Sequence, residues 1–231
     1  MSYTFSVIIP VLNEPLIVNQ TIEHVYRLGS GFELEMIVVD GDMEGKTIKE
    51  IKNRNVVKSV SPKGRGKQMN KGASLAHSDI LLFLHTDTEL PEDAFAAISS
   101  TIDKVRCVAG SFDLGIKSER LIFRLLEQLV YVRTRFTRIP YGDQAIFIKR
   151  DFFKSMKGFR EIPLMEDVDL MKRIKKSGSR ICIIPQKVKT SPRRWEREGV
   201  IYCTLRNRVL ISLYHLGVNP ERLVKFYYKD W

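Results

Sequence analysis

The segment FLHTDTELP, residues 83–91, places polar side chains directly after an apolar run. The run Ile80–Leu84 is typical of a buried strand, yet His85 and Asp87 follow it at once. Burying a lone carboxylate costs several kcal/mol unless the group is paired or bound to a metal. Asp87 is therefore either a turn residue in water or a carboxylate held at the edge of a sheet to bind a cation.

Two further apolar runs end in acidic residues. SVIIPV is followed three positions later by Glu14, and MIVVD ends at Asp40, just before Gly41. A carboxylate at such a position can accept a hydrogen bond from a nucleobase N–H or a ribose hydroxyl, as acids do in nucleotide sites. A plain turn is the competing interpretation of Asp40. Divalent cations prefer oxygen ligands and keep bound phosphates in their coordination shell. Asp87, a diphosphate and water would together complete such a shell.

A basic loop, Gly64-Arg65-Gly66-Lys67, resembles a phosphate-binding loop only in part. The P-loop pattern needs Gly at 61 and Ser or Thr at 68, and this chain has Ser61 and Gln68. What remains is a glycine-flanked basic loop before a helix. Both Arg65 and Lys67 suit a phosphate in that position, and a solvated basic loop is the alternative.

A pair of acids, Glu166 and Asp167, begins the helical segment MEDVDLMKRIKK. A helix N-terminus favours an ionised carboxylate, which is the form that a general base requires. Ordinary acids of a first helical turn are the alternative.

These residues belong to a chain in which apolar strands alternate with amphipathic helices. That pattern predicts an α/β protein with a parallel sheet covered by helices on both faces. Ligands of such doubly wound sheets bind outside the carboxyl ends of the strands, so one crevice would collect Glu14, Asp40 and Asp87. We expect the next helix to start at Pro91, with Thr88 as its N-cap. Because no repeat or linker interrupts the sequence, we predict one domain over residues 1–231 with a helical tail.

The 231 residues include 38 Lys and Arg against 27 Asp and Glu, a net charge of +11. This charge favours anionic partners: nucleic acid, phosphorylated small molecules or an acidic membrane surface. Three scattered cysteines with no CxxC pair imply neither a zinc ribbon nor a disulfide framework. The first residues lack the basic start of a signal peptide, and no stretch approaches the roughly 18 apolar residues of a spanning helix. We therefore expect a cytoplasmic protein, with peripheral contact at the inner membrane surface as an open alternative.

Five segments resemble the family 2 glycosyltransferases in order and spacing: SVIIPVLNE, VVDG, GRGKQMNKGA, FLHTDTELP and MEDVDL. The resemblance covers essentially the whole chain. It implies a GT-A fold, a Rossmann-like, mainly parallel sheet with helices on both faces and a helical C-terminal tail. Residues 1–90 would form the nucleotide-binding half and residues 91–231 the acceptor-binding half. The compact size and the segment RRWEREG also resemble a small soluble subgroup associated in some genomes with arsenosugar biosynthesis.

The resemblance assigns roles to eleven residues. For the nucleotide it implies Pro10, Glu14, Asp40, Arg65 and Lys67; for the metal, Asp87; for catalysis, Asp167 and Glu166; and for the diphosphate and acceptor, His85, Arg194 and Trp195. Asp167 matches the catalytic base, and Asp87 the last acid of an Asp-X-Asp motif that holds Mn²⁺ or Mg²⁺. The chain departs from the family twice. His85 replaces the first acid of that motif, and Ser191 replaces the Gln of a Gln-X-X-Arg-Trp motif.

The activity that the resemblance implies is an inverting, metal-dependent transfer of a sugar from a nucleotide-diphosphate sugar to an acceptor hydroxyl. A cation neutralises the departing nucleoside diphosphate, and a base takes the proton of the acceptor. A UDP-sugar is favoured because many relatives use uracil. The acceptor is either a small molecule or lipid-linked.

Two other functions fit parts of the sequence. A nucleotidyltransferase that makes a nucleotide sugar would share the fold, but it usually has a Gly-rich signature where this chain has PVLNEP; release of pyrophosphate would reveal it. The third interpretation, a nonenzymatic binder of anions or membrane surfaces, is supported only by the net charge of +11. Its binding to nucleic acid would be blind to sequence and steeply dependent on salt, and acids at three strand ends would lack a purpose. We therefore expect no nucleic-acid partner.

The segment 119–136 predicts a helix that is apolar around more than half of its circumference. Five arginines surround it: Arg120, Arg124, Arg133, Arg135 and Arg138. Such a helix can rest on an anionic bilayer and meet a lipid-linked acceptor. A core helix or a homodimer interface is the alternative.

Overall fold

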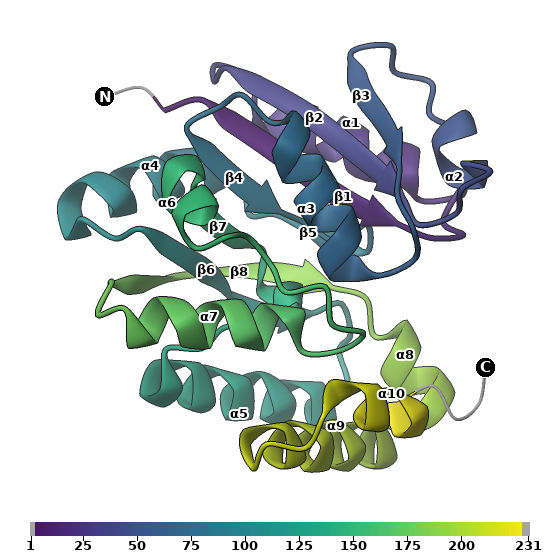
Figure 1. Ribbon diagram of the computed structural model, residues 1–231, viewed down its shortest axis with the longest axis vertical. Coiled ribbons are helices and arrows are strands. Elements are labelled where there is room, and N and C mark those ends of the chain that lie inside the picture. The colour runs from purple at the N-terminus through teal and green to yellow at the C-terminus, as the bar shows by residue number, and fades with distance from the viewer. Residues whose placement is uncertain (1–2, 228–231) are drawn as a thin grey trace.

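A curled sheet of eight strands forms the centre of the structure (Figure 1). The computed structural model describes residues 3–227, so the outermost residues of the predicted domain, 1–2 and 228–231, lie outside it. The strands are β1 (Phe5–Val11), β2 (Leu34–Asp40), β3 (Val56–Val60), β4 (Ile80–Phe83), β5 (Thr88–Glu89), β6 (Ala109–Ile116), β7 (Ile146–Lys149) and β8 (Ile181–Thr190). Their order across the sheet is β3-β2-β1-β4-β7-β6-β8-β5.

Strand directions confirm a mainly parallel sheet. Strands β3, β2, β1 and β4 run parallel, as do β6 and β8. Strand β7 lies between β4 and β6 and runs antiparallel to both, while β5 runs antiparallel to β8. Because Phe83 at the end of β4 pairs with Ile146 at the start of β7, residues just before β7 lie at the edge where β4 ends.

Helices cover both faces of the sheet, as predicted. One face carries α1 (Val18–Leu28), α4 (Ala94–Val105) and α5 (Leu121–Thr137), and the other α3 (Arg65–Leu75), α6 (Arg150–Ser155) and α7 (Glu166–Lys176). The two-residue period of β1 explains this arrangement, because Val7 and Ile9 pack into the first layer and Ile8 into the second. Short helices α2 (Lys46–Lys49) and η1 (Gly142–Gln144) lie in connections.

The predicted helical tail is present and packs against the start of α7. It consists of α8 (Arg193–Glu198), α9 (Val200–His215) and α10 (Pro220–Tyr227). Leu210 of α9 and Leu223 of α10 pack on Met165 and Val168 at the start of α7. None of the helices within residues 3–227 combines the length and the apolar character needed to cross a bilayer.

One predicted helix start was wrong. Thr88 does not cap a helix that begins at Pro91: Thr88 and Glu89 form β5, and α4 begins at Ala94. The reason is a long-range pairing, since Thr88 lies opposite Thr190 at the end of β8. Backbone groups of β8 therefore provide the partners that a local capping motif would otherwise have supplied.

Close packing of α3 on the sheet leads to a first prediction, on Gly72. A Cβ at this position would lie 2.4 Å from Cγ2 of Ile8, a side chain with no exposed surface. Gly72→Ala should therefore lower the free energy of unfolding by about 1–3 kcal/mol, even though Ala is the better helix former. Urea denaturation followed by circular dichroism measures this change. Ser74→Ala, on the exposed side of α3, is the control and should stay within about 0.5 kcal/mol; an equal loss in both variants would contradict the packing argument.

Candidate active site

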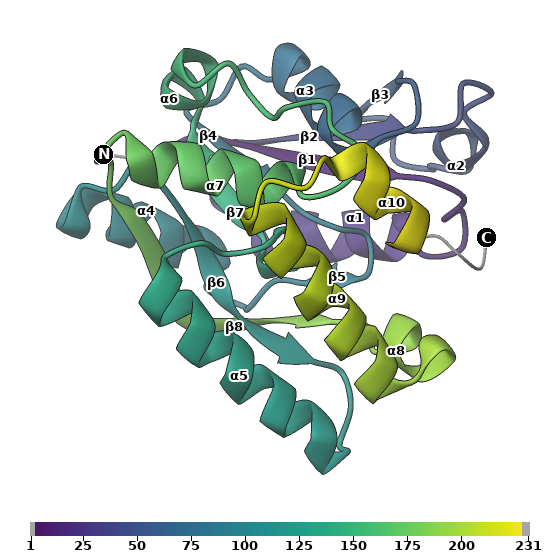
Figure 2. The same ribbon diagram turned by 60° about the horizontal axis from the view of Figure 1, so that its bottom comes forward.

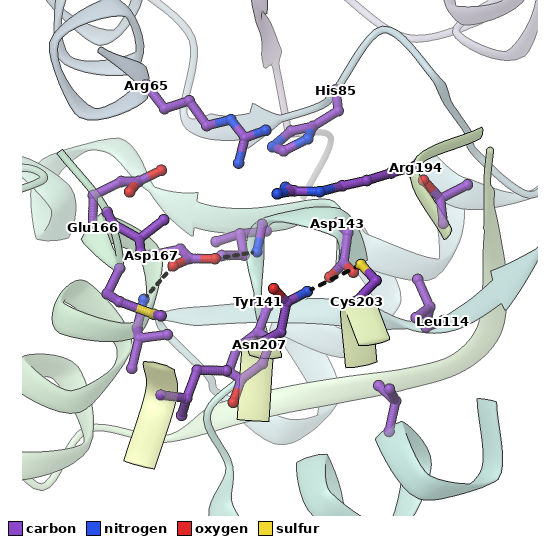
Figure 3. Close-up of a pocket in the computed structure, with 18 of the residues that line it drawn as sticks. Arg65, His85, Leu114, Tyr141, Asp143, Glu166, Asp167, Arg194, Cys203 and Asn207 are labelled. Carbon is purple, nitrogen blue, oxygen red and sulfur yellow. Dashed lines mark hydrogen bonds between the residues drawn. The ribbon is translucent and has the colours of Figure 1, made fainter. Parts of the chain in front are cut away.

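A cavity of about 270 Å³ lies where β4 ends and where β7 and α7 begin (Figure 3). Its lining comes from segments far apart in the sequence, including α3, β6, α5, η1, α8 and α9. Seven of the eleven predicted site residues line it: Arg65, His85, Asp87, Glu166, Asp167, Arg194 and Trp195. The other four, Pro10, Glu14, Asp40 and Lys67, are not among its lining residues.

Asp167 is held in place by backbone hydrogen bonds at the start of α7. Its Oδ2 accepts the N–H of Gly142 at 2.6 Å, and its Oδ1 accepts the N–H of Val168 at 2.7 Å (Figure 3). Gly142 packs closely against the site: a Cβ there would lie 3.1 Å from Nε2 of His85 and 3.4 Å from Oδ2 of Asp167, so a larger residue would displace His85 by a few tenths of an ångström. The start of η1 and the start of α7 are thereby fastened together beside His85.

Glu166 and Asp169 have environments different from that of Asp167. Glu166 is 6% exposed, and burial, assisted by the charge of Asp167, raises its pKa to about 7. Asp169 lies outside the cavity lining. Its carboxylate pairs with Arg173 at 2.7 Å and accepts the hydroxyl of Tyr214 at 3.3 Å, which ties α7 to α9. Of the three acids in this turn, Asp169 is therefore the one with a structural task.

His85 and Asp87 reach the cavity from the loop after β4. Burial lowers the pKa of His85 to about 4, and the nearby guanidinium of Arg65 acts in the same direction. The imidazole is therefore neutral near pH 7 and offers one donor and one acceptor. Asp87 keeps 31% of its side chain exposed and lies 3.7 Å from Nη2 of Arg193. A partly exposed carboxylate of this kind remains open to a ligand.

The cavity also contains Asp143, which we did not identify from the sequence. Burial raises the pKa of Asp143 to about 6; Arg133 opposes this shift, and the charges of Asp167 and Asp87 add to it. Its buried Oδ1 has no hydrogen-bond partner among the described residues. Three carboxylates that repel one another in one cavity leave a surplus of negative charge, which a bound cation would offset.

The residues present fit the divalent cation that the family resemblance implies. Within residues 3–227, no group of three or more His, Cys, Asp or Glu side chains is arranged to hold a metal by itself. A shell of one carboxylate, Asp87, completed by a diphosphate and water needs no such group. The unpartnered oxygen of Asp143 and the surplus negative charge around it favour a cation in this cavity.

A signal for Asp143 existed in the sequence, in Gly142-Asp143-Gln144, which is separated from the strand IFIK by one residue. The acids that we predicted at strand ends, Glu14, Asp40 and Asp87, lie at or just after the ends of strands, whereas Asp143 precedes one. Because β7 runs antiparallel to β4, residues that precede β7 share the edge where β4 ends. Gln144 fixes this connection, since its Nε2 donates to the carbonyl of Phe112 and its Oε1 accepts from Arg133 at 2.8 Å.

The predicted nucleotide-binding acids organise the neighbouring strand ends. Asp40 has no exposed surface, and its carboxylate accepts the backbone N–H groups of Asp42 and Thr47 at 3.0 and 2.8 Å. Glu14 accepts the hydroxyl of Thr86 at 2.6 Å, and burial raises its pKa. The ends of β1, β2 and β4 thus meet at one edge, while a role of these acids in binding a nucleotide stays a prediction. The same holds for Pro10 in β1 and Lys67 in α3.

Arg194 and Trp195 connect the cavity to the tail and to α5. The guanidinium of Arg194 stacks over the ring of Tyr227 at 3.9 Å and donates through Nε to Glu198 at 3.1 Å. Its Nη2 is buried without a hydrogen-bond partner among the described residues. Trp195 packs edge-on against Phe123 with ring centroids 6.1 Å apart. Arg194 is therefore held by Tyr227 and Glu198, and its Nη2 can still donate a hydrogen bond to a ligand.

The sheet order, the helices on both faces and the acidic cavity at the strand ends define a protein of the GT-A fold class. Residues 6–161 match the family Glycosyl transferase family 2, and the chain belongs to this family. No protein of curated function matches the chain.

Solved structures of glycosyltransferases share the fold. Mannosyltransferase PcManGT from Pyrobaculum calidifontis, in complex with GDP-Man and Mn²⁺, has a TM-score of 0.68 at 19% identity over 91% of this chain and 61% of that chain. TarS 1–349 from S. aureus, in complex with UDP-GlcNAc, has a TM-score of 0.61 at 18% identity over 81% and 58%. Glucosyl-3-phosphoglycerate synthase from Mycobacterium tuberculosis, in complex with Mn²⁺, UDP and phosphoglyceric acid, has a TM-score of 0.57 at 16% identity over 80% and 69%. This chain spans about three fifths of the length of PcManGT and of TarS 1–349. The structural likeness confirms the predicted GT-A fold.

The raised pKa of Asp143 leads to a second prediction. Because its pKa is about 6 in the folded protein against an ordinary 3.8, the folded state binds more protons between these values. The stability that the protonated group contributes is therefore lost as pH rises through this window. Asp143→Asn removes the buried charge and should raise the free energy of unfolding by about 1–2 kcal/mol at pH 7.5, with little change near pH 4.

Urea denaturation of this variant at the two pH values measures the effect. Asp151→Asn, at an exposed position of α6, is the control and should show no such dependence on pH. A loss of stability at pH 7.5 would mean that attraction to Arg133 outweighs the cost of burial.

Proposed function

We propose that the protein is an inverting, metal-dependent glycosyltransferase that moves a sugar from a nucleotide-diphosphate sugar to an acceptor hydroxyl. The observation that carries this proposal is the position of Asp167. It lies in the same cavity as Asp87 and His85, with its carboxylate oriented by two backbone N–H groups. Membership of Glycosyl transferase family 2 supports the activity.

The similar structures support the class of donor. Their titles name GDP-Man, UDP-GlcNAc and UDP, two of them together with Mn²⁺. We propose a UDP-sugar as the first donor to test, and Mn²⁺ or Mg²⁺ as the cation. Such a cation, held by Asp87, would neutralise the charge on the departing diphosphate.

Asp167 is the proposed general base. The acceptor oxygen forms a bond to the anomeric carbon from the face opposite the diphosphate, and the bond from that carbon to the diphosphate oxygen breaks, which inverts the configuration. Asp167 takes the proton of the acceptor hydroxyl. Two backbone N–H groups occupy part of the acceptor capacity of its carboxylate, and the remaining lone pairs can receive this proton.

Basic and neutral groups around Asp167 suit a charged donor. Arg65 and Arg194 line the same cavity and supply positive charge for phosphate oxygens. The neutral imidazole of His85 can hydrogen-bond a ribose hydroxyl or a water without adding charge. Residues 1–90 then form the donor half and residues 91–231 the acceptor half. The segment 193–199 remains our reason to propose the arsenosugar-associated subgroup within the family.

The cation site yields the third prediction. Wild-type protein should gain thermal stability from UDP or GDP with Mn²⁺ beyond the gain from either alone, because a ligand at 100 times its Kd adds about 2.7 kcal/mol. Asp87→Asn should lose the part of this gain that depends on Mn²⁺. A thermal-shift screen of nucleotides and nucleotide sugars measures both effects. Asp151→Asn controls for the loss of a carboxylate, and an unchanged Mn²⁺ dependence in Asp87→Asn would move the cation elsewhere.

The base assignment yields the fourth prediction. Asp167→Asn keeps the shape of the side chain but removes the proton acceptor, so single-turnover transfer or donor hydrolysis should fall by roughly 10²–10⁴-fold. Donor affinity, measured by calorimetry, should change little. Glu166→Gln should reduce the rate less, since one position along a helix turns a side chain by about 100°.

Asp169→Asn is the matched control in the same helical turn. It removes the negative charge that pairs with Arg173 at 2.7 Å, so its melting temperature should fall while the rate per folded molecule stays near that of the wild type. A fully active Asp167→Asn enzyme would refute the mechanism. An inactive Glu166→Gln enzyme with active Asp167→Asn would transfer the role of base to Glu166.

A further inference from the structure

Helices α5 and α9 carry a large share of the exposed apolar surface. In both views they lie along the same side of the molecule, which Figure 2 turns toward the reader. Ten of the sixteen large apolar side chains exposed within residues 3–227 belong to these two helices. They are Leu121, Leu125, Leu129, Tyr131, Val132 and Phe136 of α5, and Ile201, Tyr202, Leu205 and Val209 of α9. We call this surface the α5–α9 face.

The apolar residues of this face form a stripe along each helix. In α5, Leu121, Leu125 and Leu129 recur every four residues, and Leu121 is 84% exposed. In α9, Ile201 and Leu205 follow the same spacing, continued by Val209. Residues four apart lie on one side of a helix, so each stripe points in one direction. Exposed apolar stripes on neighbouring parts of one side mark a contact with a protein or a membrane.

The charges of the α5–α9 face are almost all positive. Helix α9 contains no Asp or Glu, and the one acid within α5, Glu127, is 3% exposed and paired with Arg124 and Lys187. Exposed arginines stand at both ends of α5, Arg120 and Arg138. Within 119–138 the other acid is Glu119, so basic groups outnumber acidic ones five to two.

We propose that the α5–α9 face binds the surface of an anionic membrane. Apolar stripes bordered by arginines match a bilayer interface, where apolar side chains enter the acyl boundary and cations meet lipid phosphates. A second copy of the chain fits the face less well, because two arginine-rich surfaces would repel each other. Neither helix within the described chain can span a bilayer, so the contact is peripheral.

Binding of the α5–α9 face to a membrane would bring the cavity close to amphiphilic acceptors. Apolar side chains line part of the cavity beside the α5–α9 face: Leu114 and Ile116 of β6, Leu126 and Val130 of α5, and Ile211 of α9. The two helices also contribute polar lining, Arg133 of α5 and Thr204, Asn207 and Arg208 of α9. Its other end carries Asp167 and His85 (Figure 3). Apolar lining from β6, α5 and α9 in the same cavity as Asp167 suits an amphiphilic acceptor, whose hydroxyl reaches Asp167 while its apolar part contacts these apolar side chains. This role of the cavity rests on the proposed glycosyl transfer, whereas membrane binding itself does not.

Co-sedimentation with vesicles tests the proposal and is the fifth prediction. Wild-type protein without any donor should sediment with vesicles of phosphatidylcholine and phosphatidylglycerol, much less with phosphatidylcholine alone, and less at high salt. The double variant Leu125→Gln/Leu205→Gln should bind at least about tenfold more weakly, because two leucines no longer leave water. Arg120→Gln/Arg138→Gln should weaken binding mainly at low salt.

Controls change exposed side chains outside α5 and α9. Leu16→Gln changes a side chain that is 87% exposed before α1, and Lys52→Gln/Arg54→Gln removes two exposed charges near β3; both should bind like the wild type. No binding of the wild type at low salt, or an equal loss in the controls, would overturn the proposal. Dimers in ultracentrifugation that dissociate on Leu125→Gln/Leu205→Gln, with vesicle binding unchanged, would assign the face to a second copy. Failure here would leave the donor and Asp167 experiments unaffected, so the two proposals are judged separately.

Discussion

The crowding of carboxylates in one cavity is the constraint on which the rest of the structure depends. Asp87, Asp143, Glu166 and Asp167 line a common space, and burial raises the pKa of two of them, Asp143 and Glu166. Such a group costs stability unless hydrogen bonds or cations offset its charge. The loop that begins at Gly142 supplies an N–H group to Asp167, and arginines from α3, α5 and α8 supply positive charge. Natural proteins retain an arrangement of this cost where it serves chemistry.

The helical tail completes this arrangement from outside the sheet. Leu210 and Leu223 pack on the start of α7, and Tyr214 donates to Asp169 in the same turn as Asp167. Arg194 is stacked on Tyr227, so α8 and α10 support each other beside the cavity. The tail therefore acts on the position of the acids as well as on the surface that α9 presents. Helix α9 thus both lines the cavity and contributes to the exposed α5–α9 face.

Much of the fold followed from the sequence because its signals are local. Continuous apolar runs mark strands buried on both faces, and β1, β2 and β4 appear where such runs occur. The wide apolar helix predicted over 119–136 appears as α5, one to two residues displaced at its ends. The start of α4 was misplaced because β5 exists only through its pairing with β8. A partner a hundred residues away leaves no local signal.

The sequence by itself determined the α/β class, the family resemblance and the acids and arginines at the strand ends, because these depend on residue type and spacing. Tertiary structure decided which of them share the cavity. It brought Asp143 into the same cavity as His85 and Asp167 by reversing β7. It also left the apolar stripes of α5 and α9 uncovered on one side. Strand direction and helix packing depend on contacts between distant segments, so residue spacing alone does not reveal them.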